Sequence, residues 1–254
     1  SQGLVYGCAI SQPAIGGGQD LFVAYFNWDG TLAGSTYFGG PGDETATGAA
    51  LDYANRLVVC GHVDVGDAFP SAITPLQAWH GDTDGFLVRF HGTALADAGT
   101  YVGGEGDDRL VQVASADSSG MVLLGNTSSV SGIAVAGALS PIAPGGHDAF
   151  LMKVDTNLAV VHGTYFGGSG NDVANDLVLR GNSVLIGGAS TSQSLYGTID
   201  PYQAQNAGGS DGFIALLDHD FALLQASFMG GVEEDAIAAV CFDDLGGIYA
   251  TGTT

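Results

Sequence analysis

The chain has 254 residues, of which 42 are glycine and 46% are hydrophobic, so it is long enough to bury a large core. Its 5 Lys and Arg residues stand against 27 Asp and Glu residues, which gives a net charge of −22. Nucleic-acid phosphates and anionic membrane surfaces repel such a chain, and no apolar run approaches the ~20 residues that span a bilayer. The composition excludes nucleic-acid binding and membrane insertion, and it favours many short strands joined by tight turns.

Strand-like apolar runs separated by turn residues follow one another along the whole chain. In chain order they are 4–11, a run that opens at Asp20, a run that ends in "TYFGG", 47–52, 56–62, 84–90, 96–102 and, after two further repeats, 236–243 and 247–253. Short turns join the first two and the last two runs of a repeat, as antiparallel hairpins require. No stretch has sustained helical periodicity.

The same turn signature recurs at spacings of 64, 64 and 63 residues. It reads "TYFGGPGDE" from Thr36, "TYVGGEGDD" from Thr100, "TYFGGSGND" from Thr164 and "SFMGGVEED" from Ser227. Two further markers keep this step: an Asp two residues before a Phe, and a glycine that ends a strand. The markers are Asp20, Asp84, Asp148 and Asp211, and Gly61, Gly125, Gly188 and Gly252. Four antiparallel strands per repeat of this length predict an all-β fold, a β-propeller with four-stranded antiparallel blades.

We expect one propeller domain, or a fragment of a propeller, over residues 1–254. It holds about four blades, and the first blade is incomplete at the N-terminus. The blade repeats cover roughly 1–40, 41–104, 105–168 and 169–231, and residues 232–254 start a further or closing blade.

The pattern of "TYFGG", "SGND" and "DAF" before a hydrophobic strand resembles the SBBP β-propeller repeat of bacterial secreted and cell-surface proteins. "GDAFPS" at 66–71 matches that family's Asp-Phe-Pro step, and the resemblance covers essentially the whole chain. It implies a propeller and an extracellular, bacterial protein, and it implies no reaction. "GGEGDDRLV" also fits the calcium-binding nonapeptide of β-rolls, but that motif works by repetition every nine residues, so the spacing excludes a β-roll.

The acidic turns are the candidate metal site. Their acids are Asp43, Glu44, Asp107, Asp108, Asp172, Glu234 and Asp235, and Asn171 takes the place of one acid. Carboxylates at a channel mouth suit a hard cation such as calcium, the one cofactor that we consider. The structural alternative is that these acids cap turn amides, and recurrence at every repeat favours it. The Asp before each third strand is expected to accept hydrogen bonds from the preceding loop.

Aromatic residues of the long loops are the candidate binding surface for a glycan or a protein. They are Trp79, Tyr196, Tyr202 and Phe69. The structural alternative is that these residues only pack within their own loops. No catalytic residue is assigned, because the sequence has no nucleophile–base motif, no P-loop and no metal-ligand spacing of His or Cys. The three cysteines, Cys8, Cys60 and Cys241, are too few and too far apart for a disulfide framework, so we expect buried free thiols.

The runs add up to seventeen strands, one more than a closed four-bladed ring needs. The runs at 4–11 and 247–253 compete for the same place in a blade. Three explanations are open: the chain is part of a longer propeller, it exchanges strands with a neighbouring copy, or one run lies outside the ring. The chain begins with Ser1 and not with Met, which fits a mature or trimmed product. We expect a secreted or cell-surface structural and binding protein without catalysis, associating with itself through its terminal strands. The alternative is a propeller lyase or hydrolase that acts on glycans at the loop face.

Overall fold

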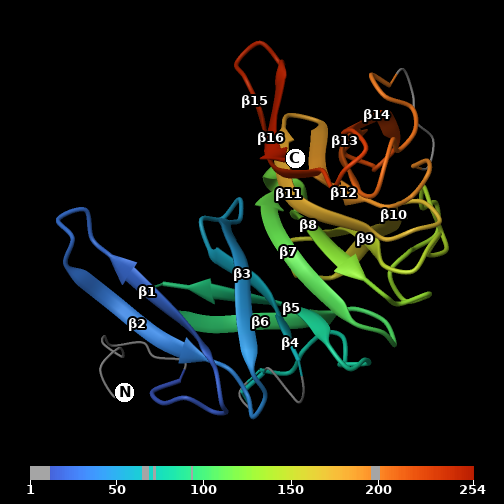
Figure 1. Cartoon of the computed structure of the whole chain (residues 1–254). Helices are drawn as coiled ribbons and strands as arrows, with labels where there is room; N and C mark the ends of the chain where they lie inside the picture. Colours follow the sequence, from blue (N-terminus) through green and yellow to red (C-terminus); the bar gives the residue numbers. More distant parts are fainter. Residues whose placement is uncertain (1–11, 65–68, 71–72, 93, 196–200) are drawn as a thin grey trace. The chain divides into compact units, whose positions relative to one another are not determined.

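The computed structural model describes residues 12–64, 69–70, 73–92, 94–195 and 201–254. These ranges contain sixteen β-strands and one short 3-10 helix, η1 (Asp117–Ser119), so the predicted all-β fold is confirmed (Figure 1). Among the described residues no helix has the length and apolarity needed to cross a bilayer. The chain divides into two compact units, which are Ser1–Met121 with Asp155–Ala159, and Val122–Val154 with Val160–Thr254.

The strands of the first unit form a hairpin and a four-stranded sheet, and begin one further sheet. The hairpin consists of β1 (Leu21–Phe26) and β2 (Leu32–Phe38). The sheet has the order β3 (Glu44–Leu51), β4 (Leu57–Val63), β5 (Asp84–His91) and β6 (Leu95–Val102), and all its neighbours are antiparallel. These four strands lie within three residues of the predicted runs at both ends.

Two more four-stranded sheets and a last hairpin follow. The order β10-β9-β8-β7 is made by β7 (Asp108–Ser115), β8 (Met121–Thr127), β9 (Asp148–Val154) and β10 (Val160–Phe166). The second unit has the sheet β11 (Asp172–Arg180), β12 (Ser183–Ser190), β13 (Asp211–Asp218) and β14 (Leu223–Met229), and the hairpin β15 (Ala236–Phe242) and β16 (Ile248–Thr253). Three four-stranded antiparallel sheets confirm the predicted repeat unit. The predicted run at 4–11 lies outside the described residues, and closure into a propeller stays a prediction.

Register irregularities recur with the sequence period. We number the strand positions of a repeat first to fourth, as in β3 to β6. A bulge interrupts the first–second pairing between Ala46 and Gly48, between Ala174 and Asp176, and between Ile237 and Ala239. The bulged Thr47 donates a hydrogen bond to the carbonyl of Leu110 (2.8 Å), and the bulged Asn175 donates one to Ile237 (2.8 Å). A bulge re-aims one side chain, and here it links the first strand to the first strand of the next repeat.

The bulge also explains the glycine that ends each second strand. A β-carbon on Gly61 would overlap the carbonyl oxygen of Thr45, and one on Gly188 would overlap that of Val173. The bulged first strand brings its backbone so close that only glycine fits opposite. This sequence marker is therefore a packing requirement of the repeat.

Candidate functional site

A buried carboxylate closes each "GG" turn at the start of a first strand. It accepts a hydrogen bond from the backbone N–H of the second glycine, four residues earlier. The pairs are Glu44 with Gly40 (3.2 Å), Asp108 with Gly104 (2.7 Å), Asp172 with Gly168 (2.7 Å) and Asp235 with Gly231 (2.7 Å). Such bonds satisfy turn amides that would otherwise be buried without a partner, which is the structural alternative that recurrence favoured.

A second carboxylate opens or immediately precedes each third strand and ties down the loop before it. Its bonds to loop amides are Gly16 to Asp20 (2.7 Å), His80 to Asp84 (2.7 Å), Gly145 to Asp148 (3.0 Å) and Ala207 to Asp211 (3.0 Å). The expectation that this Asp accepts loop N–H bonds is confirmed.

The two carboxylates meet at the first glycine of the turn. A β-carbon on Gly103 would lie 2.7 Å from Oδ1 of Asp84 and 2.8 Å from Oδ2 of Asp108. Gly167 stands in the same way between Asp148 and Asp172, and Gly230 between Asp211 and Asp235. We call each such pair a carboxylate pair. The sequence carried a signal for it, because both acids repeat with the same step at ends of neighbouring strands, but it did not show that they face each other.

The carboxylate pairs that contain Asp84 and Asp148 are electrostatically strained. Oδ1 of Asp84, Asp148 and Asp211 is buried without a hydrogen-bond partner among the described residues. Burial raises the pKa of Asp84 and of Asp148 to about 6, and the negative charges of Asp108 and Asp172, respectively, act in the same direction. A buried carboxylate beside another resists ionisation, because neither charge is solvated.

The structure places the two acids of each predicted metal pair in different surroundings. Glu44, Asp108, Asp172 and Asp235 are buried and bonded inside the turn, whereas Asp43, Asp107 and Glu234 are exposed. In the part of the chain that the structure describes, no group of three or more His, Cys, Asp or Glu residues is arranged to hold a metal ion. Calcium binding by these acids stays a hypothesis, beside the structural alternative that recurrence favours.

Phe69 belongs to the core of the first unit and not to a binding surface. It is 4% exposed, and its ring makes edge contacts with Phe38, Phe86 and Tyr101 at centroid distances of 5.7, 6.5 and 4.9 Å. The hypothesis that Phe69 binds a ligand is therefore wrong, because the ring is the hydrophobic anchor of its loop. Trp79 and Tyr202 are exposed on their loops, and Tyr196 lies outside the described residues.

The thiols differ from the expectation in one case. Cys60 is buried in β4, and burial raises its pKa to about 11. Cys241 is exposed, although all three cysteines were expected to be buried, because it lies on β15 of the last hairpin. Cys8 lies outside the described residues.

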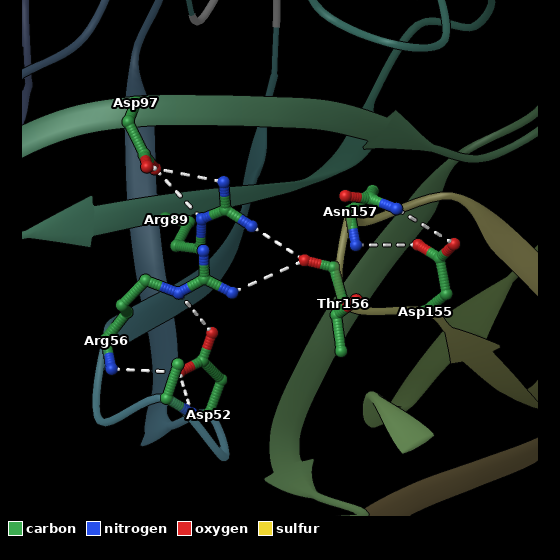
Figure 2. A network of polar contacts seen from close by, with 8 residues as sticks. Asp52, Arg56, Arg89, Asp97, Asp155, Thr156 and Asn157 are labelled. Atoms are coloured by element: carbon green, nitrogen blue, oxygen red, sulfur yellow. Dashed lines mark hydrogen bonds and ion pairs between the residues drawn. The ribbon is translucent and has the colours of Figure 1, made fainter. Parts of the chain in front are cut away.

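Two arginine side chains, Arg56 and Arg89, form ion pairs and hydrogen bonds to one turn of the first unit. Arg56 pairs with Asp52 (2.7 Å) and Arg89 pairs with Asp97 (2.9 Å), and both guanidinium groups also donate to the carbonyl of Thr156, at 3.4 and 2.7 Å (Figure 2). Asp155 shapes this turn by accepting hydrogen bonds from the N–H groups of Asn157 and Ala159. The nearby cavity of ≈ 180 Å³, lined in part by Arg56 and Leu158, is smaller than ordinary ligand pockets of roughly 300–1,000 Å³. This cluster of charges therefore serves structure.

Comparison of the chain with protein-family models and with curated proteins found no match. Fold and site together define the class: an all-β repeat protein of four-stranded antiparallel sheets, in which one carboxylate per repeat holds the GG turn and a second holds the loop before the third strand.

Proposed function

We propose that this chain is a secreted or cell-surface structural and binding protein, bacterial in origin and built from β-propeller blades. The observation that carries the proposal is the use made of the repeated acids. Each buried turn acid binds the main-chain N–H of the second turn glycine, which ends the preceding repeat, and each third-strand Asp binds loop N–H groups of its own repeat. The most prominent polar residues of the sequence thus maintain a scaffold, and scaffolds of this kind present their loops to partners.

The long loops supply the binding surface in this proposal. Trp79 lies on the loop between β4 and β5 and is 38% exposed, so it can stack on a sugar ring or a partner's side chain. The surplus of acidic residues keeps such a protein soluble in a salty extracellular medium and leaves cations, neutral glycans or other proteins as partners. A lyase or hydrolase acting on glycans is the competing function.

A binding screen with a matched pair of variants tests the proposal. The chain is probed against neutral glycans and extracellular proteins, and the best ligand is measured with Trp79→Ala and with Tyr53→Ala. Tyr53 is an exposed aromatic residue on the turn at the opposite end of the same sheet. We expect Trp79→Ala to weaken binding roughly tenfold or more and Tyr53→Ala to leave it unchanged. Equal losses in both variants, or release of cleaved glycan detected by mass spectrometry, would contradict the proposal.

A further inference from the structure

The described strands begin with the hairpin β1–β2 and end with the hairpin β15–β16 (Figure 1). Their pairing patterns match the two halves of one repeat unit. The pairing β1–β2 has its irregularity between Tyr25 and Phe26, and the third–fourth pairing β5–β6 has it at the equivalent place, between Arg89 and Phe90. The pairing β15–β16 has the bulge of a first–second pair. Thus β1–β2 supplies the third and fourth strands of a sheet, and β15–β16 supplies the first and second.

Hydrophobic side chains of β1 are exposed where complete sheets bury them. Phe22 is 59% exposed, and its three equivalents Phe86, Phe150 and Phe213 are each 0% exposed. Phe26 is 58% exposed, and its equivalents Phe90, Val154 and Leu217 are at most 2% exposed. The same positions are buried in all three complete sheets. The exposure of Phe22 and Phe26 is therefore specific to the two-stranded hairpin.

The last hairpin has the matching defect. Tyr249 of β16 is 62% exposed, whereas its equivalents Val58 and Leu185 are 0% exposed. In complete sheets the second strand pairs along its whole length with the third, as Ser183–Ser190 does with Asp211–Asp218. Within the described residues, β16 pairs only with β15, and β1 pairs only with β2. Among the described residues, each hairpin therefore has one edge without a neighbouring strand.

A cavity lies beside β1 in the described part of the first unit. It has a volume of ≈ 550 Å³, and its lining includes Val23, Tyr25, Leu51 and Leu57. In the second unit the corresponding space is filled by Leu185 of the second strand, which packs with Ile237 and Val240 of the next repeat and with Leu216 beside it. The β16 residue at the position of Leu185 is Tyr249, a side chain large enough to occupy such a space.

We propose that β16 of one copy of this chain pairs antiparallel with β1 of a second copy, completing a four-stranded sheet from two half sheets. The inference rests on the proposed structural function and names its partner. The pairings Gly188 with Phe213 and Val184 with Leu217 fix the register. Transferred to the hairpins, they place Gly252 opposite Phe22, Ala250 opposite Ala24 and Ile248 opposite Phe26. Tyr249 then lies beside Tyr25, on the face that borders the cavity.

The assembly is head-to-tail. Each copy offers one β16 edge and one β1 edge, so the contact joins different surfaces and extends into filaments unless its rotation closes a ring. Main-chain hydrogen bonds supply affinity, and the exposed aromatic residues supply register and burial.

Disulfide trapping tests the register. Ala24→Cys and Ala250→Cys are made in separate chains that also carry Cys8→Ser and Cys241→Ser; Cys60 stays, because its thiol is buried. Directly opposed residues of antiparallel strands lie within disulfide range. We expect a covalent dimer when the two chains are mixed and none from either chain alone. Ala24→Cys mixed with Ile248→Cys, two residues out of register, is the matched control and should cross-link little.

Three results would overturn the proposal. Cross-linking only inside a chain that carries both cysteines would show that the hairpins meet within one molecule. Cross-linking that needs deletion of residues 1–11 would assign the β1 edge to the run at 4–11. Absence of cross-links in every mixture would exclude the pairing. None of these results affects ligand binding through Trp79, so failure of this inference is distinguishable from failure of the proposed function.

Sedimentation of two surface variants gives a second readout. Phe22→Asp places a charge on the face that the partner covers, and Trp28→Asp places one on the turn of the same hairpin. Both residues are exposed in the single chain, so neither variant should unfold it. We expect Phe22→Asp to weaken self-association at least tenfold and Trp28→Asp to leave it unchanged, and equal association of both variants would contradict the proposal.

Discussion

At the scale of single residues, the most unusual feature is a pair of buried carboxylates in each repeat. Asp84 and Asp108 face each other across Gly103, and Oδ1 of Asp84 has no hydrogen-bond partner among the described residues. Each carboxylate is needed, because each satisfies a main-chain N–H group. The repulsion between the two carboxylates therefore destabilises the folded state, and it arises because one acid holds a turn and the other holds a loop at the same place.

Replacement of Asp84 by Asn should become more favourable as pH rises. Because its folded-state pKa is about 6 and the ordinary value is 3.8, Asp84 favours folding below about pH 4 and loses that contribution as pH rises through 6. Asn cannot ionise, so the stability of Asp84→Asn relative to wild type should increase between pH 4 and pH 8. Urea unfolding at both pH values measures this difference in stability.

The exposed neighbour Asp82 provides the control for this experiment. Asp82→Asn should keep the same stability difference from wild type at both pH values. A pH-independent difference for Asp84→Asn as well would show that its carboxylate is not strained in the folded protein.

At the scale of strands, the bulge in the first strand organises the repeat. It requires glycine on the second strand, and it aims the bulged side chain at the first strand of the next repeat. One local irregularity therefore shapes a sheet and joins it to its neighbour. The repeat length of 64 or 63 residues preserves this coupling, since bulge and glycine keep step with each other.

Gly188→Ala should destabilise the second unit by at least about 2 kcal/mol, because a β-carbon there overlaps a main-chain carbonyl that cannot move without breaking the bulge. Gly231→Ala is the control, since its β-carbon meets only Oδ2 of Asp235, at 3.9 Å. It should cost about 0.5 kcal/mol or less, the range of ordinary surface substitutions. Thermal unfolding of both variants measures the difference, and similar costs would refute this account of the marker.

At the scale of the whole molecule, hydrogen bonds join consecutive repeats, and large exposed hydrophobic side chains lie on the two terminal hairpins. In complete sheets the equivalent residues are buried, while the hairpins leave Phe22, Phe26 and Tyr249 exposed. Such surfaces mark interaction sites in folded proteins. The acidic turns, in contrast, have their buried acids engaged by main-chain groups.

Calcium should therefore have little effect on the melting temperature. Consider a calcium site with ligands such as Asp107 and Asp108 that is half saturated at one hundredth of the added calcium concentration. Binding there would raise the free energy of unfolding by about 2.7 kcal/mol, and the melting temperature by roughly 5–10 °C for a domain of this size. We expect no such rise and no fall with chelator. A rise that is lost in Asp107→Asn would instead establish a calcium site in the turns.

The sequence by itself determined the repeat, its period and the all-β class, because turn glycines, short apolar strand runs and hairpin turns are local requirements that recur along the chain. It also determined that the Asp before each third strand binds its loop, since that contact spans only a few residues. Tertiary structure alone decided that Phe69 is core, that Asp84 faces Asp108, and that Cys241 is exposed. These properties depend on which strands become neighbours, and residues far apart in the chain set that packing.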